Sequence, residues 1–153
     1  MHVGSSFREF YQRPGLAAEI GEGWLPWLLD GRGPAGAPPV NLGDDVLDLG
    51  AGPATRIPPE RVRGRVSTVE PDDWDPTDLR WPDDSFSAVS AVLVLHHLPD
   101  AGTQDRALAE FARVLRPGGV LVGLNPIDGP HFHRLDVEGL CRPIDPLTFP
   151  QRL

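Results

Sequence analysis

The sequence predicts an α/β fold organised around a mostly parallel sheet. Three observations lead to this prediction: short apolar segments alternate with helical patterns, a glycine pair follows the first apolar segment, and the 17 glycines and 18 prolines gather mainly between segments. Strands that alternate with helices form parallel sheets with right-handed crossovers. Ligands bind at the carboxyl ends of such strands, so the polar residues just beyond them are the candidates for a site.

Each expected element is placed by its apolar spacing and by the residues that end it. The strands are expected over 45–50, 66–69, 86–91 and 120–124, and the segment 92–98 is expected to leave the sheet and turn. Helices are expected over 5–30, with an interruption at Pro14-Gly15, and over 103–116, where Pro117-Gly118-Gly119 ends the pattern. Trp24 and Trp27 lie on the apolar stripe of the first helical region and are expected in the core or between helices. The segment 31–43 is expected to be a loop, and Pro58-Pro59 shorten the helix expected after the first strand.

Composition excludes several functional classes. The 153 residues fit one domain, and the net charge of −8 without a Lys/Arg run argues against a nucleic-acid partner. The densest basic stretch, 56–65, is expected to be a solvated surface. Cys141 is the single cysteine, so an intrachain disulfide and a Cys-rich metal site are excluded. No apolar run approaches the roughly 20 residues that span a membrane, and a cytoplasmic location is expected.

The strongest chemical signal is Asp48-Leu49-Gly50-Ala51-Gly52, followed by Glu70 at the end of the next strand. Glycines directly after a strand let a ligand approach the backbone, and an acidic residue on the next strand can accept both ribose hydroxyls. The alternative is that the glycines only make a tight turn. Thr55 stands where a dinucleotide-binding pattern has its third glycine, so a nicotinamide-dependent oxidoreductase is a weak third interpretation.

Four segments together resemble the class I S-adenosylmethionine (SAM)-dependent methyltransferases. Residues 46–53 (VLDLGAGP) resemble motif I of that family, and 81–89 (WPDDSFSAV) and 95–100 (LHHLPD) resemble the later motifs of its small-molecule branch. Residues 109–119 (AEFARVLRPGG) are similar to the helix and turn before that branch's fifth strand. The resemblance covers about residues 44–125 and implies a Rossmann-like sandwich with SAM as cofactor.

The resemblance also implies a role for each residue that matches a motif. At the methionine end of SAM, Gly50 and Gly52 would line the cofactor, Asp48 would help hold its amino group and Ala91 would offer its backbone. At the nucleoside end, Glu70 would bind the ribose and Asp75 would lie near the adenine amino group. Tyr11 could close the site. Trp74 could stack on adenine or anchor a loop, and the sequence leaves both alternatives open. The acidic residues of 70–84 form a solvated loop that would also favour a cationic sulfonium.

The implied reaction is direct displacement at the sulfonium methyl, which depends mainly on alignment of the acceptor with the methyl group. A base is needed only if the acceptor must lose a proton, and His96 or His97 is the candidate; the alternative is that one packs and the other is solvated. His131 and His133 could touch a substrate but are expected at the surface, and no ligand cluster supports a metal site.

Several departures from the family predict a shortened form. Only four residues separate Glu70 from Asp75, where the family has a helix, and only 28 residues follow Asn125, where it has a helix and two strands. Pro76 lacks the backbone N–H that usually meets the adenine ring.

We therefore expect one domain over 1–153, with amino-terminal helices and a loop in 1–40, a SAM-binding core in 44–125 and a shortened segment in 126–153. The sheet should lack the helix after the second strand and the last two strands. Its exposed edge suggests a homodimer. The leading function is a methyltransferase acting on a small molecule; the alternative is a non-catalytic binding or accessory protein with a degenerate SAM site.

Overall fold

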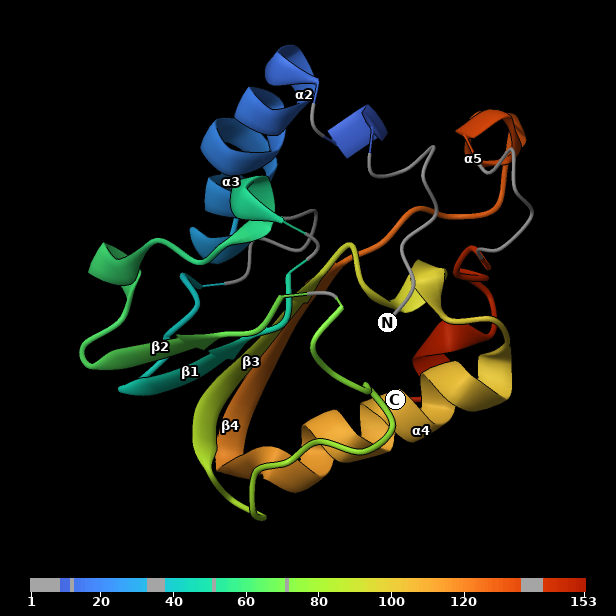
Figure 1. Cartoon of the computed structure of the whole chain (residues 1–153). Helices are drawn as coiled ribbons and strands as arrows, with labels where there is room; N and C mark the ends of the chain where they lie inside the picture. Colours follow the sequence, from blue (N-terminus) through green and yellow to red (C-terminus); the bar gives the residue numbers. More distant parts are fainter. Residues whose placement is uncertain (1–8, 12, 33–37, 51, 71, 136–141) are drawn as a thin grey trace.

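The structure, a computed structural model, describes residues 9–11, 13–32, 38–50, 52–70, 72–135 and 142–153 (Figure 1). Cys141 therefore lies outside the described residues. The strands are β1 (Asp45–Asp48), β2 (Arg65–Thr68), β3 (Phe86–Val92) and β4 (Leu115–Leu124). The helices are α2 (Pro14–Ala18), η1 (Glu19–Trp24), α3 (Leu25–Leu29), η2 (Pro53–Thr55), η3 (Pro59–Arg61), η4 (Leu95–His97), α4 (Ala101–Val114), α5 (Pro130–Leu135) and η5 (Phe149–Gln151).

The described strands form one parallel sheet in the order β2-β1-β3-β4. Val46 of β1 pairs with Val66 of β2 on one side and with Ala88 of β3 on the other. The chain therefore leaves β1 toward one edge and returns on its other side, which creates a switch point beside β1. The predicted parallel α/β fold and the short sheet are confirmed.

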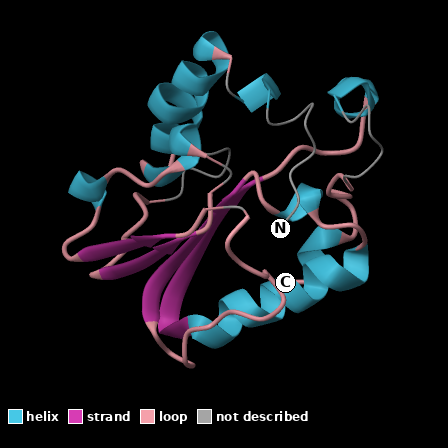
Figure 2. Ribbon diagram, viewed as in Figure 1, coloured by secondary structure: helices cyan, strands magenta, loops and turns pink. Residues whose placement is uncertain are grey.

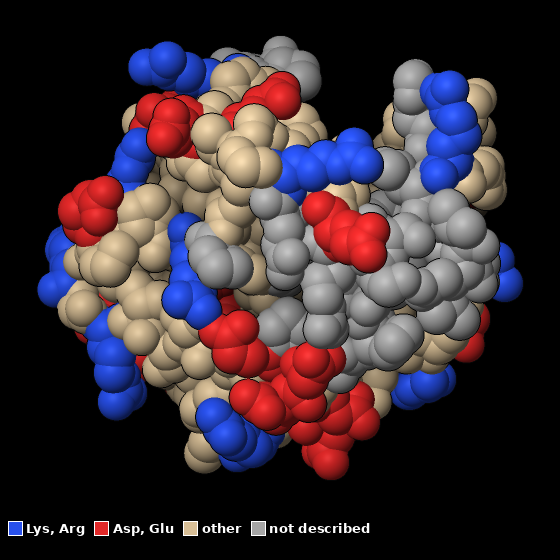
Figure 3. All heavy atoms as spheres, turned by 45° about the horizontal axis from the view of Figure 1, so that its top comes forward, with Lys and Arg blue, Asp and Glu red and all other residues tan. Residues whose placement is uncertain are grey.

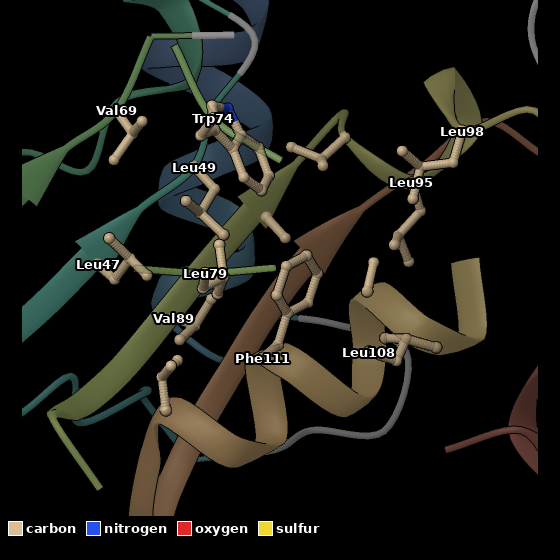
Figure 4. Close-up of a cluster of buried hydrophobic side chains, with 14 of the residues drawn as sticks. Leu47, Leu49, Val69, Trp74, Leu79, Val89, Leu95, Leu98, Leu108 and Phe111 are labelled. Atoms are coloured by element: carbon tan, nitrogen blue, oxygen red, sulfur yellow. The ribbon is translucent and has the colours of Figure 1, made fainter. Parts of the chain in front are cut away.

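Helices cover both faces of this sheet (Figure 2). Residues that alternate along β1 point to opposite faces: Leu47 packs in the cluster under α4, and Val46 packs in the cluster under the amino-terminal helices. Figure 4 shows the first cluster, in which Phe111 of α4 points toward Val89 and Leu79. The central strands are buried on both sides, as expected of apolar runs in a parallel sheet.

The helix α4 passes directly into β4, two residues before the predicted helix end. Asp100 caps the start of α4, where its side chain accepts a hydrogen bond from the Thr103 backbone N–H at 2.7 Å. Leu115 already pairs with Phe86, and Val120 is the next residue in register, opposite Ala88. The intervening Pro-Gly-Gly segment forms a bulge in β4 rather than a turn before it. An edge strand tolerates this, because a proline there breaks no essential ladder bond.

The amino-terminal helices run without a break from α2 through the π-helical η1 into α3, and Pro14 occupies the first turn of α2. Their buried side chains, Ile20, Leu25 and Leu29, cover the sheet. The expectation that Trp24 and Trp27 lie in the core is wrong, since they are 39% and 41% exposed. None of the described helices has the length and apolar character that a membrane crossing requires.

Candidate functional site

A tight glycine turn follows β1 and is clasped by Thr55. The Thr55 backbone N–H and hydroxyl both donate to the Gly52 carbonyl, at 3.1 and 2.9 Å. A side chain at Gly50 would place its Cβ only 2.2 Å from the Thr55 hydroxyl oxygen, so only glycine fits. Gly52 has a φ of +143° and open space where a Cβ would lie. The turn therefore needs both glycines and leaves its outer side accessible at Gly52.

The buried side chain of Asp48, the last residue of β1, stabilises this turn. It has no solvent exposure. One carboxylate oxygen accepts from the Gly50 N–H at 3.2 Å, and the other accepts from the Ile57 N–H at 2.7 Å. Burial raises the pKa of Asp48 to about 6, against the lowering effect of these two hydrogen bonds. Asp48 thus fixes the backbone on both sides of the turn and carries a negative charge beneath it at neutral pH.

The strand register brings the predicted acidic residue to the same level as the glycine turn. Asp48 pairs with Thr68 of β2, so Gly50 and Glu70 each lie two residues beyond a paired position. Asp48 also pairs with Ser90 of β3, which puts Ala91 one residue further along the neighbouring strand. Gly50 and Glu70 therefore lie just beyond their strands at one carboxyl edge of the sheet, whereas Ala91 is still inside β3, where it pairs with Gly123 and is buried.

Glu70 makes an ion pair that sequence reasoning missed. The guanidinium of Arg56, one residue beyond Thr55, is paired with the Glu70 carboxylate. The two side chains are 46% and 53% exposed, so the pair lies at the surface. Arg56 was expected in a solvated basic stretch, and no local sequence signal indicates that it bridges the glycine turn to the end of β2.

A pocket of about 670 Å³ lies between the segments 72–77 and 97–103, and its lining residues do not include Gly50, Gly52 or Glu70. Asp75 lies on its wall, where its carboxylate accepts from the backbone N–H and hydroxyl of Thr77 at 2.8 and 2.7 Å. These hydrogen bonds lower the pKa of Asp75. Trp74 also lines the pocket, but most of its ring is buried against Phe111, with ring centroids 6.5 Å apart. Trp74 is therefore a core anchor with one side toward the pocket.

Tyr11 contacts the two histidines, of which His97 lines the pocket. The Tyr11 hydroxyl and the His96 Nε2 share a hydrogen bond of 2.8 Å, and the His96 and His97 rings pack against each other with centroids 3.9 Å apart and planes tilted by 40°. Burial and the neighbouring His97 hold the pKa of His96 well below 6.5, so its imidazole is neutral at pH 7. His97 lines the pocket although it is only 4% exposed, and His96 is fully buried. The structure thus places Tyr11 against the two histidines, a contact that the sequence did not predict.

The remaining histidines and the surface charge complete the description of the candidate site. Within the described part of the chain, no three His, Cys, Asp or Glu side chains gather as metal ligands would. His133 instead pairs with Asp128 at 2.7 Å on the surface, and the side chain of His131 is outside what is described. Figure 3 shows one group of acidic side chains at the lower edge of this face, with further acidic and basic side chains spread over the rest of it.

Comparison with known families identifies this arrangement. Residues 47–123 match the sequence pattern of the family described as "Methyltransferase domain". The chain belongs to this methyltransferase family. The match runs from β1 to β4 and so includes the glycine turn, the acidic residue after β2 and the pocket. The resemblance to class I SAM-dependent methyltransferases is confirmed, and the family does not support the nicotinamide-dependent alternative.

Curated relatives of this methyltransferase domain are considerably longer. The 27-O-demethylrifamycin SV methyltransferase of Amycolatopsis mediterranei (strain S699) is 35% identical over a match that covers 57% of this chain and 40% of the relative. The methyltransferase GfsG of Streptomyces halstedii is 41% identical, with 43% and 22% covered. The matched part thus spans two fifths or less of the length of these relatives.

Solved methyltransferase structures share the fold. A complex of the Trm112 methyltransferase activator and a putative methyltransferase from Haloferax volcanii has a TM-score of 0.59 at 16% identity, covering 99% of this chain and 75% of that one. A SAM-dependent methyltransferase from Thermotoga maritima, a possible histamine N-methyltransferase, has a TM-score of 0.54 at 17% identity, with 96% and 77% covered. A putative methyltransferase from Bacillus halodurans C-125 has a TM-score of 0.53 at 21% identity, with 72% and 58% covered. These likenesses support the architecture.

Proposed function

We propose that this domain binds SAM and transfers its methyl group to a small molecule. The observation that carries the proposal is the strand register, which sets Gly50 and Glu70 at one level of the sheet with Ala91 beside them. The names of the two curated relatives, both methyltransferases and one acting on a rifamycin, support a small-molecule acceptor. SAM would supply an activated methyl group on a positively charged sulfur, and the chain would supply alignment.

The described residues fit such a cofactor. The outer side of the turn is open at Gly52, where the backbone can approach the methionine part. Glu70 would accept the ribose hydroxyls. The pocket of about 670 Å³ lies in the roughly 300–1,000 Å³ range of small-molecule sites, and Asp75 and Trp74 on its wall would face the adenine. The acidic surroundings would also favour a positively charged ligand.

His97 is our candidate for a base, should the acceptor have to lose a proton. It lines the pocket, whereas the buried His96 contacts Tyr11 and the His97 ring. An imidazole is able to act as a base, and His97 would be positioned by the His96 ring packed against it. Tyr11, hydrogen-bonded to His96, would close this end of the site over the bound molecules.

A non-catalytic binding protein with a degenerate SAM site is the second candidate. The observation that favours it is the Arg56–Glu70 ion pair, because the guanidinium occupies the carboxylate that a ribose would need. The short sheet, with β2 as an edge strand, points the same way, since it leaves the nucleoside side open.

Calorimetric titration distinguishes these candidates. The domain is titrated with SAM, with its demethylated product and with NADH. Micromolar binding of the first two, and none of NADH, is the expected result. Glu70→Ala should weaken binding of SAM at least tenfold, on the order of one charge-assisted hydrogen bond. Glu60→Ala, which removes another exposed acid, is the matched control and should leave the affinity unchanged. A folded domain that ignores SAM would support the second candidate, and unchanged affinity in Glu70→Ala would refute the ribose assignment.

We also propose that the domain forms a homodimer through the edge of β4. In the described sheet β4 has a neighbour on one side only, and Leu121 in its middle is 37% exposed. Exposed edge strands are usually covered or paired. Light scattering should give a dimer mass that Leu121→Lys reduces to that of a monomer. A monomer mass for the unmodified chain at high concentration would remove the proposal.

A further inference from the structure

Arg56 and the cofactor need the same acceptor. A ribose that binds through both hydroxyls uses both oxygens of a carboxylate, and the Arg56 guanidinium already pairs with one oxygen of Glu70. The two ligands of Glu70 therefore compete. The pair joins the glycine turn to the end of β2 and spans the place where a nucleoside would lie.

The Arg56–Glu70 ion pair is weak enough for a bound ribose to displace the guanidinium. Arg56 and Glu70 are each about half exposed, and exposed ion pairs contribute little because water screens them. Removing such a competitor should change the affinity for a ribose by no more than about fivefold. Arg56 can leave Glu70 without disturbing the core, since its side chain points into solvent rather than into either buried cluster.

A displaced Arg56 would start from the glycine turn. Its backbone directly follows Thr55, whose N–H and hydroxyl hold the Gly52 carbonyl of that turn. The methionine end of SAM would lie against this turn with an ammonium and a carboxylate. Asp48 provides negative charge beneath the turn for the ammonium, and the surrounding acids disfavour the carboxylate unless a cation meets it.

We propose that Arg56 is a specificity residue with two positions: it pairs with Glu70 in the ligand-free domain and moves to the carboxylate of the cofactor when the ribose takes Glu70. This inference rests on the proposed SAM-binding function. Arg56 would thereby select ligands that carry both a ribose and an amino-acid carboxylate, and would disfavour nucleosides that lack the second group.

The test compares two ligands that differ in the amino-acid end. Wild type, Arg56→Met and Arg56→Lys are titrated with the demethylated product of SAM, which has the carboxylate, and with 5′-methylthioadenosine, which lacks it. Arg56→Met should bind the first about tenfold more weakly, through loss of a charge-assisted contact, and the second about two- to fivefold more tightly. Arg56→Lys should fall between. Arg61→Met, which breaks the comparable exposed pair with Asp30, should change neither affinity.

The opposite signs are diagnostic, because a general loss of structure would weaken both ligands. Shifts of Arg56→Met in the same direction, or no shift, would overturn the proposal while leaving the SAM site intact. A wild-type domain that binds neither ligand would remove the proposed function and this inference with it.

Discussion

Replacement of Asp48 by Asn should change how stability depends on pH. A carboxyl group with a raised pKa in the folded state holds its proton longer there than in the unfolded chain. Its contribution is fully present below pH 3.8 and is lost as the pH rises to about 6. Each pKa unit corresponds to about 1.4 kcal/mol, so ionisation of Asp48 costs the native state about 3 kcal/mol over this window. Asn cannot ionise and avoids this loss.

The assay is urea denaturation of wild type and Asp48→Asn at several pH values. Between about pH 4.5 and about pH 7.5, the difference in unfolding free energy should shift by about 2 kcal/mol in favour of the variant. The absolute difference also contains a pH-independent cost of about 1–3 kcal/mol, since Asn keeps one acceptor and turns an N–H donor toward the second backbone N–H.

Ser90→Ala serves as control, because it alters a buried neighbour in register with Asp48 that does not titrate. Its difference from wild type should stay constant with pH. A constant difference for Asp48→Asn too, or one that moves in favour of wild type as the pH rises, would refute the assignment of a raised pKa. If the negative charge of Asp48 contributes to cofactor binding, Asp48→Asn should bind SAM more weakly than wild type, even though it is relatively more stable at high pH.

Three further variants test the packing around the site. Gly50→Ala should lower the free energy of unfolding by about 1–3 kcal/mol, because its Cβ would meet the Thr55 hydroxyl. In urea titrations, adding Thr55→Ala should restore part of this stability, and additive losses from the two substitutions would contradict the clash. Phe111→Ala should cost about 3–5 kcal/mol by calorimetry, since the ring is fully buried between α4 and the sheet, and a cost below about 1 kcal/mol would argue against that packing. Tyr11→Phe should cost about 1 kcal/mol and shift the ring nitrogen resonances of His96 in nuclear magnetic resonance spectra; unchanged resonances would rule out their hydrogen bond.

The sequence predicted most of the strands and the common level of Gly50 and Glu70 along the sheet. Strand positions follow from short apolar runs, and β1 and β3 agree with the expected segments within two residues. Gly50 and Glu70 could be placed together because parallel strands share a carboxyl edge. The end of α4 was missed, since Pro-Gly-Gly usually stops a helix, whereas here the edge position of β4 admits it as a bulge.

Side-chain contacts between loops were beyond sequence reasoning. The pairing of Arg56 with Glu70 depends on how two turns approach across β1 and β2, and no periodicity encodes that approach. The dual position of Trp74 was left open for the same reason: whether a loop tryptophan faces solvent or the core depends on the residues that α4 presents to it.

The glycine turn ends a strand that is hydrogen-bonded on both flanks, away from the outermost strands of the sheet. Segments added beyond β2 or β4 would enlarge the protein outward and leave the turn, its buried carboxylate and its threonine clasp in place. An extra strand or a further module could therefore be added at either border of the sheet without rebuilding the glycine turn and its supporting residues.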